Sequence, residues 1–160
     1  MHSRIFQITK EQAEQENYLN ENTLEQGDVA SIDYCAEIDL KNREESIAYL
    51  VDSILPKGMF TRLGANIIRY NGGMEQWKEE TVAQIKEKAA ALTADNYFRF
   101  GELYTLKKAV ENPLDTAYLF YTDKEGLQSW ADQSYDFMCM VNELEEGALL
   151  YIGGVIDYHF

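Results

Sequence analysis

Apolar residues recur at helical spacing over residues 47–55, which is the clearest predicted element of the chain. Five aliphatic side chains share one helical stripe: Ile47, Leu50, Val51, Ile54 and Leu55. Asn42 and Glu45 form a capping-box pattern before the stripe, and Pro56 and Gly58 stop the helix after it. We therefore expect an amphipathic helix whose stripe faces the core.

Three further segments have helical periodicity, at about residues 74–92, 93–110 and 127–144. The first has an inward stripe of Met74, Trp77, Thr81, Ile85, Ala89 and Leu92. The second is apolar on more than one side, so we expect it to be either central in the fold or covered by a partner. The third has an apolar stripe that we expect to face the core.

Apolar runs rich in β-branched and aromatic residues predict the strands. These runs are residues 4–9, 59–63, 66–70, 116–122 and 148–160. Gly64 separates the second and third runs, a spacing that a hairpin explains. Gly153 and Gly154 interrupt the last run, where we expect a bulge or a tight turn.

Two segments have weaker patterns. Residues 10–28 hold few apolar anchors and are predicted to be an exposed, irregular or weakly helical excursion. Residues 28–39 are ambiguous, because their apolar positions fit a helical spacing while their Ile and Val content suits a strand. A helix is the preferred interpretation of this second segment.

The elements together indicate the fold class. Strands and helices mix without regular alternation, and no repeat, low-complexity tract or linker divides the 160 residues. We predict a single α+β domain over residues 1–160, with a mainly antiparallel sheet of about four to six strands packed with about three to five helices. A parallel, doubly wound sheet is the alternative.

Charge is the strongest feature of the composition. The formal net charge is −14, although 46% of the residues are hydrophobic, so the chain has the composition of a folded, acidic domain. Residues 11–53 hold twelve acidic and two basic residues, a net −10, and residues 112–160 hold nine acidic and one basic, a net −8. If the two segments meet on one face, their field attracts basic partners and repels nucleic acid and anionic membrane.

Several classes of function are disfavoured by the sequence. It lacks both glycine-rich phosphate-binding patterns and any cluster of Lys and Arg, which argues against nucleotide binding through those loops and against nucleic-acid binding. No apolar run approaches the roughly 20 residues of a membrane span, and residues 1–10 do not resemble a signal peptide. We expect a cytoplasmic protein without membrane attachment and without a cofactor.

The cysteines and histidines supply no signature of a site. Cys35 and Cys139 are isolated from each other and are expected to be reduced, buried and structural. His2 and His159 stand near the two ends of the chain and would approach each other, with Asp157 nearby, if the first and last strands pair. The spacing alone predicts no metal site, because a metal needs three or four convergent ligands.

The preferred candidate site lies in the ambiguous segment, at Asp28, Asp33, Tyr34, Glu37 and Asp39. A helix would place Asp33 and Glu37 on one face, where like charges raise the pKa of one carboxyl group, although such pairs arise by chance in a chain with 28 acidic residues. The chain is also rich in tyrosine, a residue favoured at protein interfaces.

Two hypotheses of function follow. The first is a non-catalytic acidic module, of inhibitor, immunity or adaptor type, that binds a basic protein through carboxylates and tyrosines. The alternative is a small enzyme or small-ligand-binding domain with a pocket of aromatic and carboxylate residues that no motif reveals. A homodimer formed through residues 94–111 is compatible with either hypothesis.

Overall fold

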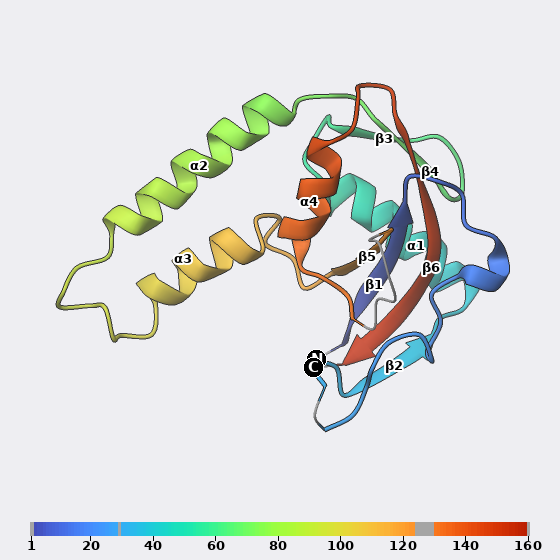
Figure 1. Cartoon of the computed structure of the whole chain (residues 1–160), viewed down its shortest axis with the longest axis horizontal. Helices are drawn as coiled ribbons and strands as arrows, with labels where there is room; N and C mark the ends of the chain where they lie inside the picture. Colours follow the sequence, from blue (N-terminus) through green and yellow to red (C-terminus); the bar gives the residue numbers. More distant parts are fainter. Residues whose placement is uncertain (1, 29, 124–129, 160) are drawn as a thin grey trace.

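The computed structural model describes residues 2–28, 30–123 and 130–159, and it has the α+β architecture that the sequence predicts (Figure 1). The described strands are β1 (His2–Thr9), β2 (Tyr34–Glu37), β3 (Phe60–Arg62), β4 (Ile67–Tyr70), β5 (Leu119–Thr122) and β6 (Leu149–His159). The described α-helices are α1 (Leu40–Tyr49), α2 (Met74–Ala90), α3 (Glu102–Glu111) and α4 (Ser134–Asn142). The six strands form one mixed, mostly antiparallel sheet.

Strands from the two ends of the chain form the centre of this sheet. β1 and β6 pair antiparallel, from His2 opposite His159 to Thr9 opposite Tyr151. The strand order is β3-β4-β6-β1-β5, with β5 parallel to β1. β4 pairs with the first part of β6 and β2 with its last part, so β2 and β4 share one edge of β6. The N- and C-terminal ends therefore lie side by side (Figure 1).

The glycine pair in the last strand forms the expected bulge. Phe6 pairs with Val155 but Ile8 pairs with Ile152, so Gln7 faces two residues, Gly153 and Gly154. β6 continues through this irregularity as one strand. The bulge keeps apolar residues on the correct sheet face on both sides of the glycines.

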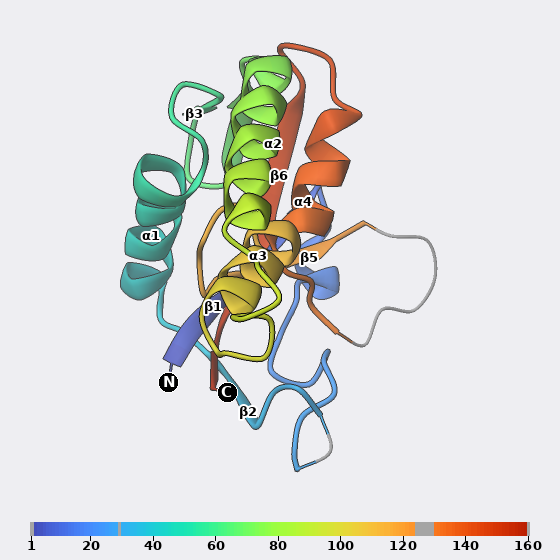
Figure 2. The same cartoon turned by 90° about the vertical axis from the view of Figure 1, so that its left-hand side faces the viewer.

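Each face of the sheet has its own apolar cluster. On the helix face, Phe6 and Phe120 pack with Ile47 of α1 and with Phe137 and Val141 of α4. Figure 2 shows α1 and α4 on the two sides of this face. On the loop face, a smaller cluster of buried residues comprises Ile5, Leu19, Leu24, Ile32, Cys35, Ile156 and Tyr158. The excursion expected over residues 10–28 thus covers the loop face through Leu19 and Leu24 rather than standing free in solvent.

The helix predicted around residues 47–55 is present, with one correction at its start. Ile47, Leu50 and Leu55 are buried and Val51 and Ile54 pack against the same cluster, so the stripe faces the core as predicted. The capping residue is Asp39 and not Asn42, because the Asp39 carboxylate accepts a hydrogen bond from the Asn42 amide at 2.8 Å. The last turn, Leu50–Ile54, is a π-helix that ends before Pro56.

The segment of residues 28–39 is not a helix, which corrects the preferred interpretation. Residues 34–37 form strand β2, in register with residues 156–159 of β6. A short apolar run has no decisive period of its own, and the free edge of β6 supplies the pairing that selects a strand. The β3–β4 hairpin and strand β5, by contrast, form where the sequence predicts them.

Helices α2 and α3 form an antiparallel pair that extends away from the sheet, which we call the arm (residues 74–111; Figure 1). Only the start of the predicted stripe reaches the core of the fold: Met74 is buried in it and Trp77 packs against it, whereas the stripe beyond Trp77 does not. The second predicted helix is shorter than expected, because turns occupy residues 94–100, and it is peripheral rather than central. No helix among the described residues is long and apolar enough to cross a bilayer.

The helix expected over residues 127–144 is shorter than predicted, because α4 begins at Ser134 and the described residues 130–133 are not helical. Asp132 instead forms an isolated β-bridge with Phe120 of β5. Residues 124–129 lie outside the described part of the chain. The buried residues of α4 include Phe137, Met138 and Val141, so this helix faces the core as the sequence predicts.

Candidate functional site

Residues 11–39, which we call the acidic apron, concentrate exposed carboxylates. The apron contains nine acidic residues and neither lysine nor arginine. All nine acidic residues are exposed: Glu11, Glu14, Glu16, Glu21, Glu25, Asp28, Asp33, Glu37 and Asp39. Within the described part of the chain, Asp33 is the one apron carboxylate that forms an ion pair, with His159. The apron is therefore a run of solvated negative charge with little local neutralisation.

The second acidic segment, residues 112–160, is more strongly neutralised. Asp115 pairs with Lys108 at 2.5 Å, Glu143 pairs with Lys10 at 2.9 Å, and Asp157 pairs with Arg4. The backbone amide of Lys10, the residue directly before the apron, also donates to the carboxylate of Asp123 at 3.0 Å. Glu145 and Glu146, in contrast, precede β6 and lie at the opposite end of that strand from β2. The unpaired charge is thus greatest on the apron.

Gln7 holds the apron against the loop face of the sheet. Its buried side chain donates from Nε2 to the carbonyl of Asn17 at 3.0 Å. Its Oε1 accepts from the backbone amides of Leu19 and Gly154, each at 2.8 Å. The absence of a side chain at Gly154 lets the Leu19 backbone pass directly over the bulge. One buried amide therefore connects the β-bulge to the acidic loop.

The five residues predicted as the candidate site do not form one cluster. Asp28 lies in the loop, whereas Asp33 and Tyr34 lie together at the end of β6. Glu37 is three residues further along β2, opposite Ile156. Asp39 caps α1, and the hydrogen bond from the Asn42 backbone amide lowers the pKa of its carboxyl group. The helical i, i+4 pairing of Asp33 with Glu37 is wrong, because the segment between them is a strand.

The free edge of β2 is partly covered by an earlier part of the apron. The Cys35 backbone amide donates to Oε1 of Gln26 at 2.8 Å, so this edge amide has a side-chain partner. Such covering protects an edge strand from pairing with another chain. Tyr34, whose side chain is half exposed, remains accessible beside the apron carboxylates.

The two histidines meet as their positions suggested. His2 and His159 are directly opposite in the β1–β6 register, and their ring centroids are 5.3 Å apart. Nδ1 of His2 lies 2.7 Å from Asp157, and Nδ1 of His159 lies 3.3 Å from Asp33. In the described residues, no group of three or more His, Cys, Asp or Glu side chains is arranged to hold a metal ion. Each of the two imidazole rings therefore has a carboxylate partner.

Neither cysteine is placed as an activated nucleophile. Cys35 is buried on the loop face, where burial and then the nearby Asp157 carboxylate raise the pKa of the thiol. His2 and His159 lie on the other face of the sheet, as the alternation along β6 requires. Cys139 is free and exposed on α4, which corrects the expectation that both thiols are buried.

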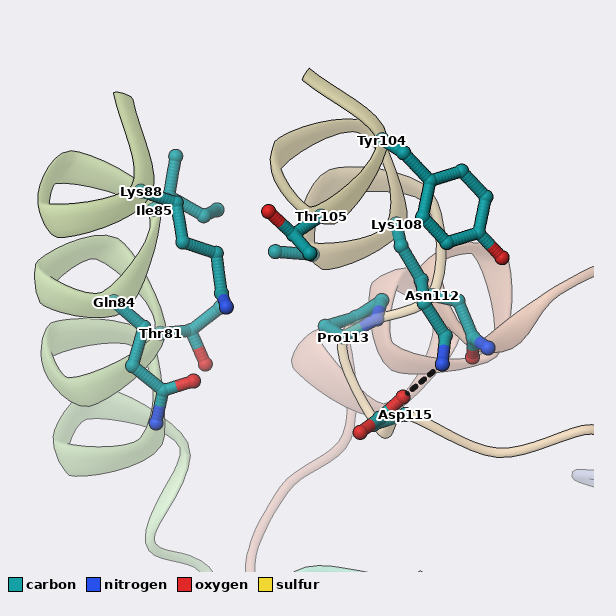
Figure 3. Close-up of a pocket in the computed structure, with 11 residues that line it drawn as sticks. Thr81, Gln84, Ile85, Lys88, Tyr104, Thr105, Lys108, Asn112, Pro113 and Asp115 are labelled. Carbon is teal, nitrogen blue, oxygen red and sulfur yellow. Dashed lines mark ion pairs between the residues drawn. The ribbon is translucent and has the colours of Figure 1, made fainter. Parts of the chain in front are cut away.

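Two hollows flank α3. A cleft of ≈ 260 Å³ between α2 and α3 is lined mainly by polar side chains, with Lys88 and Thr105 on its two walls (Figure 3). Figure 3 also shows the Lys108–Asp115 ion pair at the base of this cleft. A wider groove of ≈ 620 Å³ lies between α3 and the edge of the sheet, and its lining includes Tyr104 and Tyr158. Burial raises the pKa of Tyr158 to about 12.

Sequence reasoning missed both the unequal neutralisation of the acidic segments and the exposure of the arm. The absence of Lys and Arg between residues 11 and 39 was a usable signal for the unequal neutralisation.

The sequence matches no protein-family model, and comparison with curated proteins and with solved structures finds no significant match. The functional argument therefore rests on the geometry and charge of this chain.

Proposed function

We propose that this protein is a non-catalytic binding module that recognises a basic protein segment through the acidic apron. The observation that carries the proposal is the stretch of chain with nine exposed carboxylates and no lysine or arginine among them. A concentrated field of one sign raises the rate of encounter with an oppositely charged partner and selects against acidic competitors. The basic partner is identified by its chemistry alone, as a lysine- and arginine-rich surface or peptide.

The way the apron is held supports a binding role. The loop carrying the carboxylates is attached by three buried apolar side chains, Leu19, Leu24 and Ile32, and by the hydrogen bonds of Gln7. A loop fixed in this way loses less conformational freedom on binding than a free acidic tail. Tyr34 adds an exposed aromatic ring beside the charges, and tyrosine commonly anchors protein interfaces.

A charge-matched pair of variants tests the proposal. The apron variant carries E14Q, E16Q, E21Q and E25Q, and the control carries E79Q, E80Q, E87Q and D95N on the arm. Both sets remove four exposed acidic side chains, so the two proteins have the same net charge. Any difference between them reports the position of the charge and not its total.

The measurement is fluorescence anisotropy with a labelled lysine- and arginine-rich peptide at two ionic strengths, with an acidic peptide as the negative probe. We expect the wild type to bind the basic peptide, and salt to weaken the binding. The apron variant should lose roughly tenfold or more in affinity, since each exposed charge pair contributes about 0.2–1 kcal/mol. Equal losses in the apron and arm variants, or binding that is indifferent to salt, would contradict the proposal.

A second candidate function, small-ligand binding, is favoured by the groove between α3 and the sheet. Its volume of ≈ 620 Å³ lies in the range of about 300–1,000 Å³ typical of ligand pockets. Tyr104, Tyr158 and Lys108 would supply aromatic and polar contacts. A thermal-shift screen of small aromatic anions, repeated on the Tyr104→Ala variant, tests this candidate. A stabilising compound whose effect is lost in the variant would support it.

A further inference from the structure

The arm has little tertiary cover. Met74, at its base, is the buried residue among the 17 of α2, and none of the ten residues of α3 is buried. α2 packs mainly against α3, and the pair extends away from the sheet (Figure 1). Helices of this length are marginal in water on their own and take most of their stability from packing of an apolar face. The arm therefore exposes apolar surface that no other part of the described chain covers.

The exposed apolar surface is concentrated at the far end of the arm, which we call the tip (residues 97–104). Phe98 is 95% exposed and Phe100 is 89% exposed, while Tyr97 and Tyr104 are about half exposed. The rings pack in pairs, with centroids 5.0 Å apart for Tyr97 and Phe98 and 4.8 Å apart for Phe100 and Tyr104. Contiguous exposed aromatic surface of this kind marks an interaction site.

Charge identifies the kind of partner that the tip fits. Residues 74–111 hold seven acidic and six basic residues, a net −1, so the rest of the chain carries −13 of the −14. Two copies repel each other wherever their sheet regions approach. The 17-residue α2 is about 25 Å long, which is several times the Debye length of about 8 Å at physiological salt. Contact between two tips keeps the charged regions apart, and the repulsion between them is screened.

We infer that the tip is a self-association surface at which the aromatic residues of one copy pack against the same residues of a second copy. The contact is isologous, with a two-fold axis between the tips. Taking about 200 Å² for each aromatic side chain, the four rings of one tip expose about 550 Å². Burying all of it in both copies would remove about 1,100 Å² from water, so the contact lies at the small end of specific interfaces, near the roughly 1,000 Å² that such an interface needs. Leu103 adds apolar area on the same surface.

Sedimentation velocity over a range of protein concentrations tests the inference. The tip variant carries F98S and F100S, and the matched control carries L40S and L63S, two exposed leucines outside the arm. We expect wild type and control to dimerise with the same affinity. The tip variant should bind itself roughly 100-fold or more weakly, because buried aromatic anchors dominate interface energies. Circular dichroism of the dilute proteins checks that the tip variant keeps its fold.

Salt separates this inference from the proposed function. Added salt should leave dimerisation unchanged or strengthen it, whereas it weakens the binding of a basic peptide to the apron. A wild type that stays monomeric at high concentration, or a tip variant that dimerises like the wild type, overturns the inference. A monomeric wild type whose tip residues are needed to bind phosphatidylcholine vesicles would assign the tip to a lipid surface and would also overturn it. None of these three results bears on the apron.

Discussion

Gly154→Ala is the sharpest test of how the acidic apron is attached. Gly154 lies in the β-bulge, and a Cβ atom built there would overlap the backbone carbonyl of Leu19. That obstacle is a backbone atom, so rotation of a side chain cannot relieve it. The apron must move away, which breaks the hydrogen bonds that join Gln7 to Asn17 and Leu19.

The expected magnitude follows from these contacts. Forcing one methyl group into a packed site costs about 1–3 kcal/mol. The two hydrogen bonds of Gln7 to the apron contribute about 1 kcal/mol each, while alanine restricts the unfolded chain and recovers about 0.4–1 kcal/mol. We expect the free energy of unfolding to fall by about 2–4.5 kcal/mol. For a chain of this size, the melting temperature should then fall by roughly 5–15 °C.

Urea denaturation followed by tryptophan fluorescence and circular dichroism measures the change. Gly64→Ala is the matched control, because a Cβ at Gly64 meets nothing within 4 Å. Hydrogen exchange should show faster exchange in residues 11–33 of the Gly154→Ala protein, with the helix-face core still protected. If the two alanine variants differ by less than about 0.5 kcal/mol, the close passage of Leu19 over the bulge does not hold the apron.

Two further predictions concern the cores on the two sheet faces. Burial raises the pKa of Tyr158 to about 12 from an ordinary 10.0, so its contribution to stability is intact below pH 10 and is lost as the pH rises to 12. The loss should be roughly 2–3 kcal/mol by urea denaturation. Tyr158→Phe should remove this pH dependence and Tyr97→Phe should keep it, and the opposite pattern would refute the assignment. Phe137→Ala should lower the free energy of unfolding by about 3–5 kcal/mol, because its fully buried ring stacks on Phe120 with centroids 4.4 Å apart. Leu40→Ala, at an exposed position, should change it by less than about 0.5 kcal/mol, and a similar loss in both variants would contradict the packing argument.

Elements with a strong local pattern could be predicted from the sequence. The stripe from Ile47 to Leu55, the hairpin around Gly64 and the bulge at Gly153 and Gly154 all form as expected. In each case the information is local, because a helical period or a glycine in a strand restricts the backbone whatever its neighbours are. These elements were sufficient to indicate an α+β domain.

Elements without a decisive local pattern depended on partners distant in the sequence. Residues 34–37 become a strand because they pair with the edge of β6 at its C-terminal end. The paired residues of β6 lie more than 110 positions further along the chain. The aromatic residues of the tip look like core residues in the sequence, yet the fold leaves Phe98 and Phe100 in solvent. Hydrophobicity alone does not distinguish a residue buried within its own chain from one that a partner covers.

The sequence by itself determined the total charge, the fold class and the presence of an acidic stretch without cations in residues 11–39. Only the tertiary structure decided which carboxylates find a cation, since Lys10, Arg4 and Lys108 reach the C-terminal acidic segment and not the apron. It also decided that His2 and His159 are neighbours. The physical reason is the same in each case: ion pairs and ring contacts act over a few ångströms, and chain folding decides which distant residues come that close.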